Sequence, residues 1–169
     1  RTSAKSVRPC IAKNEILDLA ILELNEGRST DFLSFADRIE TGQDVYAFGY
    51  PLGDQLSEEI KVTDGIISSL AGIKNDQTRM QITNALQPGG SGGPLTNVSG
   101  LVVGVNASVL RGEQYQNINF SVKREQVLQF PANNKIEFSV EGPCTEKKGT
   151  DIVRDMKKIV FSIYCASKS

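Results

Sequence analysis

Apolar and polar residues alternate over several short stretches of the chain, and glycines or prolines separate these stretches. Gly42–Gly53 and Ile60–Leu70 carry β-branched and aromatic residues at a spacing of two, with glycines at the turns, which is typical of half-buried strands. Pro94 to Val105 is a short apolar run, a polar turn and a second apolar run. This pattern predicts an all-β fold of short strands joined by tight turns.

Both ends of the chain depart from this pattern. Residues 1–14 are basic and indicate no element, whereas Ile16–Leu24 is an apolar run interrupted by Asp18 and predicts a strand. After Phe130, Pro131 to Asn134 predicts a break and Lys135–Val140 a short strand.

Thr150–Tyr164 places its apolar residues at helical spacing and predicts an amphipathic helix. Its apolar face either packs against the barrel or forms a bridge to a further domain. The sequence leaves both alternatives open.

The stretch Gln87–Leu95 carries the strongest chemical signal, because Ser91 stands between two glycine pairs and two prolines. Little side-chain bulk surrounds its hydroxyl. Glycines also adopt backbone angles that let N–H groups face a developing oxyanion. We place those donors on Gly89 and Ser91, with Gly90 between them. Apolar sequence on both sides favours a tight turn in a folded sheet over a flexible linker.

The same residues satisfy G-x-S-x-G, the nucleophile elbow of α/β-hydrolases. An elbow serine opens a helix and needs a histidine later in the chain. The sequence after Ser91 predicts strands instead, and the chain contains no histidine. The elbow interpretation is therefore rejected.

Gly-Gly-Ser-Gly-Gly-Pro-Leu resembles the G-[ND]-S-G-G-P-L signature of trypsin-fold serine proteases, and its surroundings resemble the HtrA (DegP-like) branch most closely. Ile82–Pro94 is similar to that branch's T-D-A-[AS]-I-N-x-G-N-S-G-G-P stretch, and Gly100–Ala107 to its G-x-V-V-G-I-N-T strand. Asn117–Val122 looks like the strand before the closing helix. The resemblance covers roughly residues 18–130 and implies a double β-barrel, the second barrel complete and the first partial.

The resemblance implies a role for several residues. Asp18, in the Asp-Leu-Ala-Ile-Leu run, takes the place of the aspartate that orients the catalytic imidazole. Ala85 takes the base of the primary specificity pocket, with Leu86 beside it, and the absence of charge implies cleavage after small or medium apolar residues. The strand Val105-Asn106-Ala107 implies backbone pairing with an unfolded or extended polypeptide.

Two departures from the family pattern stand out. Gly90 replaces the usual Asn or Asp, which removes a side chain that braces the oxyanion loop. The catalytic histidine is also missing, and the residues before Asp18 are too few to hold the early strands of the first barrel. Three explanations remain open: a separate or upstream segment supplies the histidine, which we favour; the chain is truncated; or it is a natural pseudoprotease.

Composition and charge argue against several classes of function. The net charge is −1 without a basic cluster, which gives no support for nucleic-acid binding, and no apolar run is long enough to span a membrane. The three cysteines lack metal-ligand spacing, so we expect neither a metal nor a cofactor. Cys144 and Cys165 flank the predicted helix and could pair in an oxidising compartment, but buried or unreactive thiols are the favoured interpretation. Only the family resemblance suggests an extracytoplasmic location.

Three N-x-[ST] sequons occur, at Asn97, Asn106 and Asn119. Two of them lie in predicted strands near the site. Chance is therefore the better explanation for these sequons.

These observations divide the chain into a remnant of the first barrel (1–41), a second barrel (42–130) and a helix-containing C-terminal extension (131–169). The predicted function is that of a serine endopeptidase that acts through an acyl-enzyme. The alternative is an inactive, protease-like module that binds peptides as a chaperone or scaffold.

Overall fold

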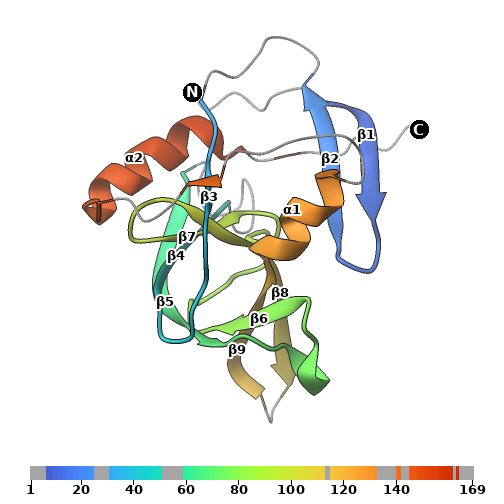
Figure 1. Ribbon diagram of the computed structural model, residues 1–169, viewed down its shortest axis with the longest axis vertical. Coiled ribbons are helices and arrows are strands. Elements are labelled where there is room, and N and C mark those ends of the chain that lie inside the picture. Colours follow the sequence, from blue (N-terminus) through green and yellow to red (C-terminus); the bar gives the residue numbers. More distant parts are fainter. Residues whose placement is uncertain are drawn as a thin grey trace.

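The structure is a computed structural model that describes residues 7–24, 31–50, 59–112, 115–132, 140–141, 145–161 and 163. Six strands form a closed antiparallel barrel in the order β8-β7-β4-β5-β6-β9, and pairing of β8 with β9 closes it (Figure 1). The strands are β4 (Asp44–Gly49), β5 (Lys61–Ser69), β6 (Arg79–Ile82), β7 (Pro94–Asn97), β8 (Val102–Gly112) and β9 (Tyr115–Lys123). The predicted mainly β barrel fold is confirmed.

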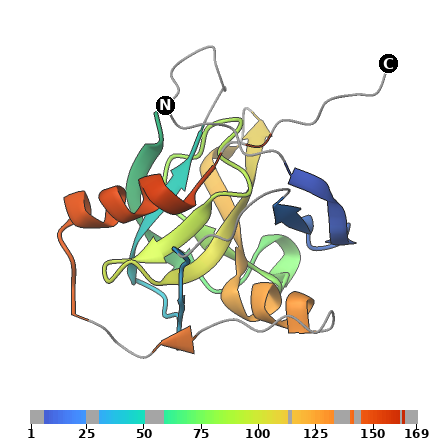
Figure 2. The ribbon, with the colours of Figure 1, turned by 90° about the horizontal axis from the view of Figure 1, so that it is seen from above.

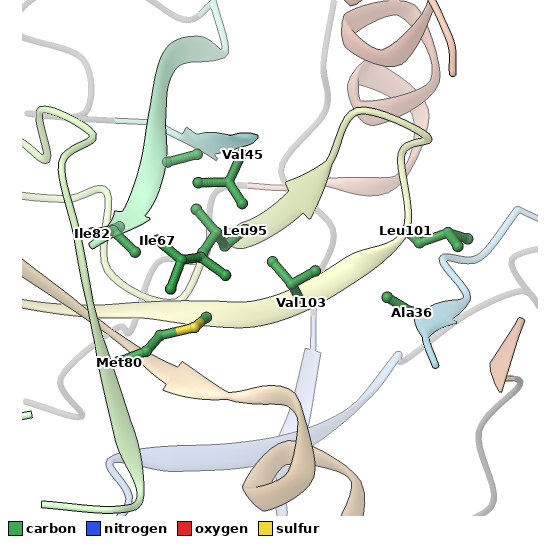
Figure 3. Close-up of a cluster of buried hydrophobic side chains, with 9 residues drawn as sticks. Ala36, Val45, Ile67, Met80, Ile82, Leu95, Leu101 and Val103 are labelled. Atoms are coloured by element: carbon green, nitrogen blue, oxygen red, sulfur yellow. The ribbon is translucent and has the colours of Figure 1, made fainter. Parts of the chain in front are cut away.

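Buried apolar side chains from strands β4 to β8 form a cluster in its interior (Figure 3). Ile67, Met80, Ile82, Leu95 and Val103 are fully buried there. Complete burial of side chains of this size contributes roughly 1.5–3 kcal/mol each, so this cluster fixes the register of the strands that carry the loops.

Short elements extend the barrel at one end. β3 (Phe35–Ala36) pairs in parallel with β8 on one side and with β10 (Val140–Glu141) on the other. Helix α1 (Arg124–Ala132) follows β9 directly, as predicted for the closing helix, and its Arg124 guanidinium donates a hydrogen bond to the carbonyl of Ala36. The 3-10 helix η2 (Ile73–Asn75) lies between β5 and β6.

Helix α2 (Gly149–Ile159) confirms the predicted amphipathic helix as far as Ile159 and packs on the outside of the barrel (Figure 2). The prediction extended the helix to Tyr164, whereas Val160 already has an extended backbone. Its buried Ile152 and Met156 lie in a second apolar cluster with Phe48 of β4 and Ile60. The hydroxyl of Tyr50 donates to the carbonyl of Val160 at 3.3 Å, and burial raises the pKa of this phenol above its ordinary 10.0. Of the two alternatives for this helix, the structure shows packing against the barrel.

A separate hairpin precedes the barrel and lies to one side of it in both views (Figure 1, Figure 2). It consists of β1 (Val7–Asn14) and β2 (Leu19–Leu24), which form a two-stranded sheet of their own. Strand β1 falls in the region where the sequence indicated no element.

The prediction of one strand over Ile16–Leu24 is partly wrong, because residues 15–18 form the hairpin turn. Asn14 Oδ1 accepts the N–H groups of Ile16 and Leu17 at 3.1 and 3.0 Å, and Asp18 has a φ of 57°. A side-chain amide that captures backbone donors in this way stabilises a turn in place of a strand.

The described residues test several other predictions only in part. Most of the expected strand Lys135–Val140 lies outside the described residues, as do Cys144 and Cys165. The side chains of Asn106 and Asn119 are buried, so neither could carry a glycan in this fold. Across the described ranges, none of the helices combines the length and the apolar character needed to cross a membrane.

Candidate active site

The loop between β6 and β7 holds Ser91 at the surface through a set of backbone hydrogen bonds. Gly90 N–H donates to Gln87 O at 2.9 Å, and Gly93 N–H donates to Gly90 O at 3.4 Å. Strand β8 fixes the far side of the turn: Gly92 N–H donates to Asn106 O at 2.7 Å, and Asn106 N–H donates to Gly93 O at 2.9 Å. The loop is therefore a tight turn and not a linker.

The hydrogen bonds of the described residues engage the N–H groups of Gly90, Gly92 and Gly93 but not those of Gly89 and Ser91. Gly89 has a φ of +87°, which a residue with a Cβ rarely adopts, so glycine is required where the chain turns before Ser91. Two unengaged N–H groups on either side of Gly90 are the donors that an oxyanion would need. The N–H group of Gly90 is already engaged within the turn, where it donates to Gln87 O.

The side chain of Ser91 is exposed, and its hydroxyl donates to the carbonyl of Ala107 at 2.7 Å. This contact brings two of the predicted site residues together, the proposed nucleophile and one end of the proposed substrate strand. It also positions Ser91 Oγ beside the point where β8 leaves its pairing with β7.

Strand β4 forms a wall behind the loop that sequence reasoning missed. A Cβ added to Gly49 would lie 2.8 Å from Gly90 Cα, and one added to Gly93 would lie 1.9 Å from Phe48 O. A Cβ on Gly90 would meet Gln87 O at 3.1 Å, which is tighter than ordinary contact. The loop thus replaces the missing side chain at position 90 with close backbone packing against β4.

A buried asparagine ties this wall to β8. Asn106 Nδ2 donates to Phe48 O at 3.2 Å and to Pro94 O at 3.4 Å, and its Oδ1 accepts the hydroxyl of Ser121 at 3.2 Å. Because an unpaired buried amide costs about 1–3 kcal/mol, this satisfied network holds β4, β7 and β8 in one arrangement beneath Ser91.

The segment before Gln87 is anchored in the same way. Asn84 is fully buried, and its Nδ2 donates to Val45 O at 3.1 Å and Thr63 O at 2.8 Å. Beyond this anchor, Ala85 and Leu86 line a cleft of about 390 Å³ together with Gly90. The structure brings these three residues together, whereas Ser91 and strand β8 do not line that cleft.

The predicted substrate strand is only partly available for pairing. Val105 is paired with Pro94 on β7 and with Val122 on β9. Both backbone groups of Asn106 are engaged by Gly92 and Gly93 of the loop between β6 and β7. From Ser108 onward, within the described residues, β8 pairs with β9 alone. The edge of β8 that pairs with no second described strand therefore starts at Ala107, whose carbonyl accepts the Ser91 hydroxyl.

Asp18 occupies the exposed turn of the β1–β2 hairpin. No hydrogen bond or ion pair joins it to Ser91 or to any other residue in the described part of the chain. The structure thus leaves its predicted partnership with an imidazole as a prediction. The described residues also bring together no group of three metal-ligating side chains.

Comparison with known proteins identifies the family. Residues 2–105 match the family model described as a trypsin-like peptidase domain. The chain belongs to this family. It is 36% identical over 127 residues to the serine protease Do-like HtrB of Bacillus subtilis. The matched residues cover 69% of this chain and 27% of that protein.

Further relatives belong to the same HtrA-like group. The probable periplasmic serine endoprotease DegP-like of Chlamydia pneumoniae is 34% identical over 112 residues, or 62% of this chain and 22% of that protein. Among solved structures, the HtrA-type protease AlgW with decapeptide superposes with a TM-score of 0.62 at 24% identity, covering 78% of this chain and 41% of that one. This likeness supports the fold.

The chain spans about a quarter of the length of the curated relatives it matches. By family, the chain is HtrA-like and trypsin-like. The activity of the complete relatives can be compared with this chain only at the residues that this chain contains.

Proposed function

We propose that this chain carries the nucleophile, the oxyanion donors and the orienting acid of a serine endopeptidase. The observation that carries the proposal is the exposed Ser91 hydroxyl, flanked by the unengaged N–H groups of Gly89 and Ser91. Such a pair of fixed donors stabilises a tetrahedral oxyanion, which is commonly the largest single contribution to acyl transfer.

In this proposal Ser91 Oγ attacks the carbonyl carbon of the peptide bond while an imidazole takes its proton. The oxyanion rests on Gly89 N–H and Ser91 N–H, the same imidazole returns the proton to the leaving amine, and water hydrolyses the acyl-enzyme. Since the sequence contains no histidine, the imidazole comes from a segment outside it. Asp18 accepts the second imidazole N–H and fixes its tautomer.

We propose residues 1–41 as the remaining part of a first barrel that such a segment completes, with the second barrel at 42–130 and an extension at 131–169. The two-stranded sheet of β1 and β2 supports this division, because an isolated hairpin is at best marginally stable in water. Added strands would both stabilise the hairpin and deliver the histidine.

The proposed substrate is an extended or unfolded polypeptide that pairs with the free edge of β8 from Ala107. The engaged backbone groups of Val105 and Asn106 confine these two residues to supporting that edge. Ala85 and Leu86 carry no charge, which favours a small or medium apolar residue before the cleaved bond. The decapeptide named with AlgW is consistent with a peptide ligand for this fold.

A second candidate is a non-catalytic module that binds peptides. Two observations favour it: the sequence has no histidine, and the Ser91 hydroxyl is already held by Ala107 O at 2.7 Å. In that case the β8 edge would bind an extended peptide without cleaving it.

Hydrolysis and binding of a casein-derived unfolded polypeptide separate the two candidates. The protease proposal expects cleavage by the protein that includes the histidine-bearing segment, and loss of cleavage with retained binding in Ser91→Ala. Peptide binding without cleavage by that protein, unchanged in Ser91→Ala, would favour the binding module.

A further inference from the structure

Strand β4 contacts helix α2 with one face and the Ser91 loop, residues 87–93, with the other. Alternate side chains at the end of the strand belong to the apolar cluster that α2 covers: Tyr46, Phe48 and Tyr50. The side chains between them belong to the cluster inside the barrel: Val45 and Ala47. Gly49 continues the inward-facing set and meets the loop, because a Cβ at this position would lie 2.8 Å from Gly90 Cα.

Helix α2 holds the outer face of β4 by apolar packing and by a hydrogen bond. Ile152 and Met156 are each 1% exposed and lie in one cluster with Phe48, which is 2% exposed. At the end of the helix, the Tyr50 hydroxyl donates to Val160 O at 3.3 Å. Closely packed side chains of this kind transmit a displacement to their neighbours because the interior is hardly compressible. The end of β4 is therefore fixed from the side of α2.

The backbone at the same end of β4 packs against the Ser91 loop. A Cβ on Gly93 would lie 1.9 Å from the carbonyl oxygen of Phe48, and Gly49 packs on Gly90. The two N–H groups that flank Gly90 are the proposed oxyanion donors. Phe48 thus contacts α2 through its side chain and the loop through its backbone, so one residue connects the helix to the site.

We propose that α2 is a positioning element for the Ser91 loop, and that Met156 and Tyr50 are the positioning residues through which it acts on β4. The helix lies beyond residue 105, where the match to the family model ends, so it adds a support to the family's domain. This support replaces the side-chain brace that the loop lacks at Gly90. The catalytic consequence rests on the proposed function, whereas the mechanical link from α2 to the loop does not.

Met156→Ala in the ¹⁵N-labelled 169-residue chain tests the mechanical link by amide hydrogen exchange. The N–H groups of Gly90 and Gly92 are hydrogen-bonded in the loop, so their exchange reports how firmly the loop is held. The matched control is Met80→Ala, since Met80 is equally buried but lies inside the barrel. We expect the two loop N–H groups to lose about tenfold more protection in Met156→Ala than in Met80→Ala, because local opening becomes easier. An equal loss in both variants would overturn the proposal.

Tyr50→Phe tests the catalytic consequence in the protein that includes the histidine-bearing segment, because it removes one hydroxyl without leaving a cavity. We expect kcat for cleavage of a casein-derived unfolded polypeptide to fall by about three- to tenfold, below the roughly 10²–10³-fold loss that follows removal of an oxyanion donor. The KM should stay unchanged, because the β8 edge is not altered. Tyr46→Phe is the control: its ring lies in the same cluster, but its hydroxyl makes no hydrogen bond to any residue that the structure describes.

The outcomes separate this inference from the proposed function. Equal kcat values for Tyr50→Phe and Tyr46→Phe, or a change confined to KM, would contradict the role of Tyr50. A parent protein that cleaves nothing and whose Ser91 takes up no fluorophosphonate would contradict the proposed function instead. In that case the exchange comparison of the two methionine variants still decides whether α2 positions the loop.

Discussion

At the scale of single residues, the loop around Ser91 depends on the absence of side chains at three positions. Gly49 and Gly93 let β4 and the loop approach to distances that no Cβ permits, and a Cβ on Gly90 would crowd Gln87 O at 3.1 Å. Backbone hydrogen bonds then take over the bracing that a side chain at position 90 provides in the family pattern. Packing with β4 therefore constrains the backbone of the loop that carries the proposed oxyanion donors.

Gly49→Ala tests this dependence. Its Cβ would lie 2.8 Å from Gly90 Cα, so the loop must shift, and overpacking of this kind costs roughly 1–3 kcal/mol. We expect a lower free energy of unfolding in urea and altered amide shifts at Gly89 and Ser91. Gly149→Ala is the matched control, because its Cβ would meet Tyr46 only at an ordinary 3.5 Å. Equal behaviour of the two variants would contradict the packing account.

Asp76 gives a prediction about pH. Its carboxylate accepts hydrogen bonds from the hydroxyl and the N–H of Thr78 at 2.6 and 2.9 Å, which hold its pKa below the usual 3.8. Because the pKa of this carboxyl is lower in the folded than in the unfolded chain, its charged form stabilises the fold at pH values above the unfolded pKa. This stabilisation is lost as the pH falls through the folded pKa.

Asp76→Asn should therefore lower the free energy of unfolding at pH 7 by about 1 kcal/mol, a small value because the side chain is 37% exposed. The difference from the parent should shrink below pH 4. Denaturant unfolding at pH 7 and pH 3 measures both values. A difference that stays constant between these pH values would show that the carboxylate charge contributes nothing.

At the scale of elements, α2 stabilises the barrel from outside by covering Phe48 and Ile60. Met156 is 1% exposed, and truncation of a buried Met to Ala typically costs 2–5 kcal/mol. Met156→Ala should lower the free energy of unfolding in urea, and with it the midpoint, accordingly, while Lys157→Ala on the exposed face should change this free energy by no more than about 0.5 kcal/mol. A midpoint unchanged in Met156→Ala would mean that α2 is not part of the cooperative fold.

The barrel strands could be predicted from the sequence because their signals are local. Alternation in Asp44–Gly49 and the turn at Val98–Gly100 follow from side-chain period and glycine position alone. The turn that ends at Asp18 was missed because the capping amide of Asn14 outweighs an apolar pattern. Strand β1 was missed because residues 1–14 show no period.

The candidate site likewise has one part that the sequence predicts and another part that it does not. The exposed, glycine-rich turn at Ser91 could be predicted from glycine spacing within a few residues, whereas the nucleophile role of Ser91 and the oxyanion role of the Gly89 and Ser91 N–H groups stay predictions. The β4 wall at Phe48 and Gly49 could not, because only the tertiary fold brings it against the loop. The hydrogen bonds that engage the backbone of Asn106 come from Gly92 and Gly93 of the loop, a tertiary contact that the sequence does not reveal. The role of Val105 to Ala107 as a substrate strand stays a prediction.

At the scale of the whole molecule, the proposed triad joins two separate parts, with Asp18 on the hairpin and Ser91 on the barrel. Asp18→Asn in the protein that includes the histidine-bearing segment should lower kcat by about 10⁴-fold, because the imidazole would hold the wrong tautomer. Glu15→Gln in the same turn, where Glu15 pairs only with Lys13 among the described residues, should leave kcat unchanged. Equal rates for the two variants would remove Asp18 from the triad.

The central claim is that Ser91 is a nucleophile activated by a histidine from outside this sequence. Fluorophosphonate labelling, mapped by peptide mass spectrometry, tests it most directly when the protein purified from its source is compared with the 169-residue chain alone. The account predicts an adduct on Ser91 of the source protein and little or none on the isolated chain. A source protein in which Ser91 remains unmodified while a control serine protease is fully labelled would contradict it.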